Sequence, residues 1–300
     1  MRLQFENVNF DSRSGPNSFG LKLAKQLQKM NVIITNDSPD VRLAFIQSSC
    51  NYSPTVLRLD GIYFNSSQDW KRLNDPIKKS YNFAKSIIAQ SEFNKELIIK
   101  YFGYRDDINV INNGTDLNLI KELSPAEIEG VDPDKEVWLC ASSWRPHKRL
   151  SENIRYFYEF APDDAIMLIA GSNPDVDIKS MDRINYLGDL SWYQLISVMK
   201  RSTTFVHLSW LDHCPNVVVD ARACGCKIIC SSSGGTKEIA GDNSVIINEE
   251  PWDFRPLELY SPISLDFSKA ESNKNIPKDI DIINVTKKYK IVLRAAYGLN

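Results

Sequence analysis

The chain has 300 residues, of which 43% are hydrophobic, enough for two domains that each bury a core. Its formal net charge is −2, from 36 Lys and Arg against 38 Asp and Glu, which argues against a nucleic-acid-binding protein with its usual basic surface. No apolar run approaches the roughly 18 residues of a membrane-spanning helix, and the first residues lack a signal-peptide pattern. We therefore expect a cytoplasmic protein without a transmembrane segment, and peripheral contact with a membrane stays open.

The cysteines predict neither a metal site nor a disulfide framework. They are Cys50, Cys140, Cys214, Cys224, Cys226 and Cys230. None of their separations matches a zinc site, so we expect small buried hydrophobic residues in a reducing compartment. The sequon at residues 51–53 is then expected to occur by chance.

Short apolar runs alternate with amphipathic stretches through the first half of the chain. Strands are expected within residues 1–10 and at 31–35, 41–46, 55–59, 86–90 and 108–111. Helices are expected at 19–30, 69–83 and 91–102. The second helix should be interrupted near Pro76, because proline lacks the N–H that a helix interior needs.

Three places in this half are candidates for a site. Gly15 lies in a predicted loop, 14–20, where glycine lets a ligand approach the backbone, although a simple turn is an equal alternative. Asp60 follows the strand 55–59, and parallel sheets bind ligands beyond the carboxyl ends of their strands. A capping role for Asp60 is again an equal alternative. Asn113-Gly114 gives a strong turn signal after the last strand.

The second half continues the alternation of strands and helices. Strands are expected at 136–142, 165–170, 204–209 and 227–230, and helices at 151–160, 191–199, 215–224, from 236 onward and at 281–297. This order indicates a parallel, doubly wound sheet.

The strongest indications of a site lie between Val206 and Gly241. Pro215 suits a first helical position, and Gly225 suits the residue that follows the same helix. The start of a helix favours an anion such as phosphate, because its first N–H groups lack partners within the helix. Asp220 lies about one turn inside, roughly 7 Å from the helix start. Its carboxylate could accept hydrogen bonds from ribose hydroxyls while a diphosphate occupies the helix start.

This segment resembles the signature of the family 4 glycosyltransferases, a retaining, group 1 type family with the GT-B fold. The family pattern is an acid, seven residues, a second acid, Ala-x-x-x-Gly, a strand and Gly-Gly-x-x-Glu. The matching residues are Asp212, Asp220, Ala221, Gly225, Gly234, Gly235 and Glu238. The family usually has Glu at both acid positions, where this chain has Asp.

The resemblance implies an α/β protein with two Rossmann-like, doubly wound domains that face a central cleft. Residues 1–114 would form the acceptor-side domain and residues 115–280 the donor-nucleotide domain. Residues 281–300 would form a helix that crosses back to the first domain.

The resemblance also implies roles for individual residues. Arg145 and Lys148 match the basic pair that holds the donor diphosphate, whose growing negative charge must be stabilised as the sugar bond breaks. Taken alone, this loop could be a solvated basic turn. Asp212 would contact the sugar, and Asp60 would lie beside the acceptor. The residues expected to bind the substrates are Gly15, Asn113, Gly188, Leu190, His213, Pro215, Asn216, Val217, Asp220, Gly234 and Gly235.

No cofactor and no metal are expected. Asp175 and Asp177 form the Asp-x-Asp pair that binds a divalent metal in the other common glycosyltransferase fold, GT-A. Here the pair lies in a polar loop beside Pro174, so we interpret the two acids as ordinary polar loop residues and not as metal ligands. Basic residues and helix ends would neutralise the phosphates instead.

The sequence therefore predicts a retaining, metal-independent transfer of a sugar from a nucleotide-diphosphate sugar to a hydroxyl of a glycan or glycolipid. Two alternatives stay open, a GT-B sugar-nucleotide epimerase or hydrolase and a catalytically weak sugar-nucleotide-binding protein. The second follows from the two Asp residues, because Asp is roughly 1.5 Å shorter than Glu and a misplacement of about 1 Å can cost ~100-fold in rate.

Overall fold

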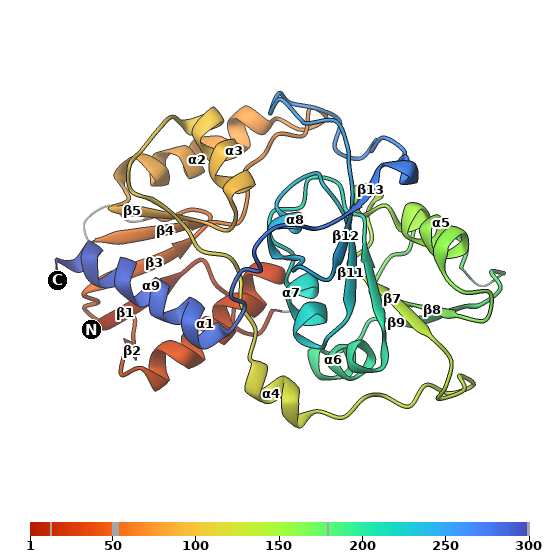
Figure 1. Ribbon diagram of the computed structural model, residues 1–300. Helices are drawn as coiled ribbons and strands as arrows, with labels where there is room; N and C mark the ends of the chain where they lie inside the picture. The colour runs from red at the N-terminus through yellow and green to blue at the C-terminus, as the bar shows by residue number, and fades with distance from the viewer. Residues whose placement is uncertain (13, 50–53, 179, 299–300) are drawn as a thin grey trace. The chain divides into compact units, whose positions relative to one another are not determined.

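The computed structural model describes residues 1–12, 14–49, 54–178 and 180–298 (Figure 1). Cys50 and the sequon at 51–53 lie outside the described residues. The chain forms two compact units, of which the first comprises Met1–Asp116, Asp253–Leu257 and Asp279–Asn300 and the second Leu117–Trp252 and Glu258–Lys278. Among the described residues, no helix has the length and apolar character needed to cross a bilayer.

The first unit is built on a parallel sheet with helices packed on it. Its strands, in spatial order, are β2 (Ile33–Ile34), β1 (Arg2–Glu6), β3 (Val41–Phe45), β4 (Thr55–Leu59), β5 (Ser86–Ala89) and β6 (Ile108–Val110). Its helices are α1 (Gly15–Lys29), α2 (Trp70–Phe83), α3 (Glu92–Phe102) and α9 (Ile282–Tyr297). The helix α9 packs against α1, with the rings of Phe19 and Tyr289 5.8 Å apart, so the last helix completes this unit's core (Figure 1).

Two predictions for the first unit are wrong. The loop predicted around Gly15 is the first turn of α1, which begins at Gly15 with Pro16 behind it, because the fixed φ of proline suits a helix start. The helix α2 runs without a break through Pro76. Its buried face, which includes Ile77 and Tyr81, packs on the core, and this packing outweighs a proline penalty of about 3 kcal/mol.

The second unit contains a larger sheet. Its strands, in spatial order, are β13 (Ala270–Ser272), β12 (Ser244–Ile247), β11 (Lys227–Ser231), β10 (Thr204–His207), β7 (Val137–Ala141), β8 (Ile166–Ala170) and β9 (Ile184–Gly188). Every pairing is parallel except that of β13 with β12. The helices are α4 (Leu117–Glu122), α5 (Leu150–Phe160), α6 (Trp192–Arg201), α7 (Asn216–Ala223) and α8 (Thr236–Ile239), with 3₁₀ turns at Pro146–Lys148 and Phe267–Lys269.

The order of these strands confirms the predicted doubly wound, parallel sheet. All residues of β7 and β10 are buried, as expected for strands covered on both faces. From β7 the chain adds β8 and β9 on one side, and it then returns to add β10, β11 and β12 on the other. The strand order therefore reverses between β7 and β10. In open parallel sheets, ligands bind at such a reversal, beyond the carboxyl ends of the strands.

Candidate functional site

The loops that follow β7 and β10 meet at this reversal of the strand order. Lys148 ends the 3₁₀ turn after β7, and Asp212 lies in the loop after β10. The two residues are 64 positions apart in the chain, and Lys148 Nζ lies 2.5 Å from Asp212 Oδ2. Their side chains are 19% and 15% exposed, so the ion pair can be reached by a ligand.

A buried histidine completes this cluster. His207, the last residue of β10, has its Nε2 3.2 Å from Asp212 Oδ2. Burial raises the pKa of the Asp212 carboxyl, but Lys148 and His207 outweigh burial and hold this pKa well below its ordinary value. Burial also lowers the pKa of His207, although Asp212 opposes this shift. At neutral pH the cluster is therefore one cation, one carboxylate and one neutral ring.

The glycine turn after β11 lies directly on the backbone of Asp212. The N–H of Gly235 donates to Asp212 O at 2.7 Å. Gly234 has φ +78°, and a Cβ built there would lie 2.8 Å from Asp212 N and nearer still to Asp212 O. A side chain at position 234 would therefore push Asp212 away from its place beside Lys148.

We expect Gly234→Ala to destabilise the protein and to abolish ligand binding at this cluster. The positive φ alone costs about 1–2 kcal/mol for an L-residue, and the contact with Asp212 adds to that cost. Gly225→Ala is the matched control, because Gly225 has φ +90° and a Cβ built there would meet no atom of the described residues within 4 Å. Thermal unfolding of both variants tests this, and equal losses of stability would contradict the close contact.

The helix α7 begins at Asn216, one residue later than predicted. Pro215 is its N-cap rather than its first helical residue, and Pro215 O accepts the N–H groups of Val218 and Val219. Val217 lies in the first turn. This helix start follows the Asp212 loop directly, so the expected anion site lies next to the ion pair.

Asp220 is buried inside α7, with an exposed fraction of 3%. The indole Nε1 of Trp192 donates to Asp220 Oδ2 at 2.9 Å. Trp192 is the first residue of α6, whose start is fixed by a capping box between Ser191 and Gln194. The sequence did not predict this contact, because nothing in the local pattern of α6 indicates where an indole N–H would point.

The remaining residues of the predicted donor site differ in how far they are exposed to solvent. Arg145 is exposed at the start of the 3₁₀ turn, and Lys148 is the residue of this turn that forms the ion pair with Asp212. His213 donates its backbone N–H to Asp212 Oδ1 at 3.0 Å. Burial lowers the pKa of the His213 ring to about 4, so this ring is neutral at pH 7.

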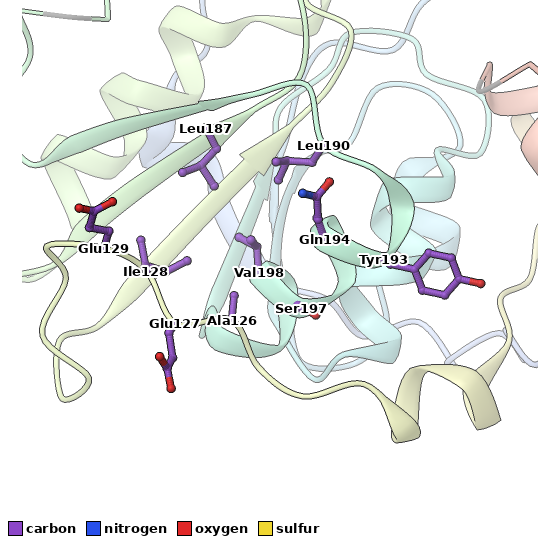
Figure 2. A pocket seen from close by; sticks show the side chains of 10 residues that line it. All are labelled: Ala126, Glu127, Ile128, Glu129, Leu187, Leu190, Tyr193, Gln194, Ser197 and Val198. Carbon is purple, nitrogen blue, oxygen red and sulfur yellow. The ribbon is translucent and has the colours of Figure 1, made fainter.

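Gly188 is the last residue of β9, and Leu190 follows it two positions later. Gly188 has φ +70°, and its carbonyl accepts the N–H of Gly171 at 2.7 Å. Leu190 points into an open groove of about 430 Å³ beside α6 (Figure 2). The groove is lined by Ala126, Glu127, Ile128, Glu129, Leu187, Leu190, Tyr193, Gln194, Ser197 and Val198. Neither the Lys148–Asp212 pair nor Asp220 is part of this lining.

In the first unit, Asp60 and Asn113 belong to one buried network around Arg58. Arg58 is fully buried, and its guanidinium lies over the rings of Phe19 and Phe45 at 4.5 and 4.6 Å from their centroids. It donates to Asp60 Oδ1 and, at 2.9 Å, to Asn113 Oδ1.

One oxygen of the Asp60 carboxyl is left without a partner. Oδ1 accepts from Arg58 and from Gln90, whereas Oδ2 is buried and has no hydrogen bond within the described part of the chain. Burial raises the pKa of this carboxyl, and Arg58 only partly opposes the shift. Asp60 therefore has one buried carboxyl oxygen whose capacity to accept a hydrogen bond is not used within the described residues.

Asp175 and Asp177 lie in the loop between β8 and β9, as the sequence predicted. Across residues 1–12, 14–49, 54–178 and 180–298, no group of three or more His, Cys, Asp or Glu side chains is arranged to hold a metal ion.

Comparison with known proteins assigns most of the second unit to a protein family. Residues 125–253 match the family model described as "Glycosyl transferases group 1". This segment is a group 1 glycosyltransferase domain. The match covers Lys148, Asp212, Asp220 and the glycine turn, and the chain is accordingly a glycosyltransferase. No curated protein sequence matches the chain.

Solved structures of other glycosyltransferases share the fold of this one. The Anabaena protein Alr3699/HepE in complex with UDP is 14% identical, with a TM-score of 0.69 over 98% of this chain and 100% of that chain. Sucrose-phosphate synthase from Thermosynechococcus elongatus is 12% identical, with a TM-score of 0.66 over 84% and 86%. WaaG, a glycosyltransferase involved in lipopolysaccharide biosynthesis, is 10% identical, with a TM-score of 0.61 over 99% and 93%. This glycosyltransferase therefore has the GT-B fold, with two Rossmann-like units.

Proposed function

We propose that this glycosyltransferase moves a sugar from a nucleotide-diphosphate sugar to a hydroxyl of a glycan or glycolipid, with retention of the anomeric configuration. The observation that carries the proposal is the Lys148–Asp212–His207 cluster at the reversal of the strand order, directly before the start of α7. HepE, which shares the fold, is known in complex with UDP and with UDP-glucose, which supports a nucleotide-sugar donor.

Arg145, Lys148 and the first turn of α7 would hold the donor diphosphate. Lys148 has three N–H donors, so it can keep Asp212 and bind a phosphate oxygen at the same time. Arg145 is exposed and can turn its planar group toward two phosphate oxygens. The helix start at Pro215, Asn216 and Val217 adds a partial positive charge.

Asp220 and Asp212 would hold the two ends of the donor. Asp220 lies deeper and already accepts from Trp192, which fixes its carboxylate for the ribose hydroxyls. Asp212 would accept from the hydroxyls of the sugar while His207 and Lys148 keep it oriented and ionised.

In the reaction, the bond between the sugar's anomeric carbon and the diphosphate oxygen breaks. A new bond forms from the acceptor oxygen to the same carbon on the same face, and the acceptor proton passes to the departing phosphate. Lys148 and Arg145 stabilise the developing negative charge, so neither a metal ion nor a protein nucleophile is needed. Asp60, with its free carboxyl oxygen, would accept a hydrogen bond from the acceptor. We expect the enzyme to act in the cytoplasm.

A donor screen tests this function. Thermal unfolding is measured with UDP, GDP, ADP and their sugars, and a ligand at 100-fold its Kd should stabilise the protein by about 2.7 kcal/mol. The stabilising nucleotide sugar is then supplied with a panel of glycan and glycolipid acceptors in EDTA. We expect release of the nucleoside diphosphate that depends on the acceptor, and a glycoside with the donor's anomeric configuration.

Other results of the screen would favour other functions. Release of an epimer or of free sugar without an acceptor would indicate an epimerase or hydrolase. Binding without turnover over the whole panel would indicate a sugar-nucleotide-binding protein in which Asp212 and Asp220 are too short for catalysis. Activity lost in EDTA and restored by manganese would point to Asp175 and Asp177.

A further inference from the structure

Arg149 has a backbone conformation that large side chains rarely adopt. It lies between Lys148 and α5, with φ 52° and ψ 50°, in the left-handed region. This conformation costs an L-residue about 1–2 kcal/mol, so other contacts must hold it in place. The Arg149 side chain is only 1% exposed, in contrast to its neighbour Lys148.

The Arg149 guanidinium is held by a two-point ion pair and by carbonyl groups. Its two terminal nitrogens lie 2.9 and 2.7 Å from the two carboxyl oxygens of Glu249, which is 100 positions away in the chain. It also donates to Ile263 O at 2.9 Å and to Leu208 O at 3.4 Å. Leu208 opens the loop that contains Asp212, so Arg149 joins that loop to its own.

Glu249 in turn holds the loop that ends in the glycine turn. It accepts a hydrogen bond from Ser231 Oγ, and its backbone N–H donates to Ser232 Oγ at 2.8 Å. Ser231 Oγ lies 2.7 Å from Ser233 Oγ, which accepts the N–H of Leu211 at 3.3 Å. Leu211 directly precedes Asp212, so this chain of hydrogen bonds leads back to the Asp212 loop.

We propose that Arg149 and Glu249 are positioning residues that align the three loops of the diphosphate site. The pair fixes the Lys148 loop through Arg149, the glycine turn through Glu249, and the Asp212 loop from both sides. The inference rests on the proposed donor site. It predicts an effect on the diphosphate end of the ligand, because Asp220, which would hold the ribose, lies in α7 and is fixed by Trp192 instead.

The test compares the binding of nucleoside diphosphates with that of the matching monophosphates. UDP, GDP and ADP are titrated by calorimetry beside UMP, GMP and AMP, with the wild-type protein and with Glu249→Gln, which keeps the shape of the side chain. We expect Glu249→Gln to weaken binding of the preferred diphosphate by about tenfold or more, since a misplacement of about 1 Å can cost ~100-fold. Binding of the monophosphate should change less than about twofold.

A second variant covers the case in which Glu249→Gln does not fold. Removing one partner leaves a buried charge unpaired, whereas replacing both by apolar residues is often neutral for stability. The double variant Arg149→Met, Glu249→Leu should therefore fold and show the same selective loss. Arg155→Met is the control, because Arg155 binds Glu152 and Leu265 O in the same unit and, among the described residues, has no hydrogen bond to the three loops.

The outcomes separate this inference from the proposed function. If the wild-type protein binds none of the three diphosphates, the donor site and the positioning role are both overturned. If it binds one, and the variants lose affinity equally for the diphosphate and the monophosphate or lose none, the pair is only structural and the donor site stands. An equal selective loss in Arg155→Met would likewise overturn the positioning role.

Discussion

Lys148→Ala is expected to weaken binding of the nucleoside diphosphate by roughly 10- to 100-fold, the range of a charge-assisted hydrogen bond worth ~1.5–3 kcal/mol. The ammonium group is one part of the effect. The other part is Asp212, whose carboxylate loses the cation 2.5 Å away and would face the diphosphate with its charge uncompensated. Arg145→Ala should cost less, because Arg145 is exposed and its charge is screened by solvent.

Calorimetric titration of both variants with the preferred nucleoside diphosphate measures this effect. Unchanged affinity in both variants would remove the loop from the donor site. The double variant Lys148→Ala, Asp212→Asn serves as a further check, because neutralising the carboxylate should recover part of the lost affinity. Strictly additive losses would mean that Lys148 and Asp212 do not act as a pair toward the ligand.

Asp220→Ala is expected to weaken nucleotide binding by roughly 10- to 100-fold, more than Asp212→Ala does, because it removes the buried carboxylate that we propose accepts from the ribose hydroxyls. Asp212→Ala should bind the nucleoside diphosphate within about threefold of the wild type, because a negative charge near the diphosphate is removed together with a partner of Lys148. Its transfer rate should fall about 100-fold if Asp212 orients the sugar.

Binding constants and turnover are measured on the same preparations. Trp192→Phe is the control for Asp220, because it removes the indole N–H that donates to the carboxylate and keeps an aromatic ring. It should weaken nucleotide binding less than Asp220→Ala does. The reverse order, with Asp212 governing binding and Asp220 only turnover, would exchange their roles.

Local sequence patterns determined most of the elements of this protein. The apolar runs at β7, β8, β10 and β11 and the turn residues between them predicted these strands to within two residues at each end. The motif of Asp212, Asp220 and the glycine turn carried the family resemblance that predicted a donor domain, and both acids lie within one strand–loop–helix segment. Such features depend on residues a few positions apart, and propensity and periodicity report on that range.

Only the tertiary structure decided which side chains meet. Lys148 reaches Asp212 because the strand order places β7 beside β10, and no local pattern contains that order. The buried pair of Arg149 and Glu249 depends on the same topology.

The errors in the prediction also arise from tertiary packing, which local sequence patterns do not contain. Proline normally breaks a helix interior, but α2 continues through Pro76 because its buried face is held by the core. The sequence thus determined the chemistry available to the site. The packing of the sheet determined which of those groups are adjacent, because burial depends on the whole fold whereas propensity depends on neighbouring residues.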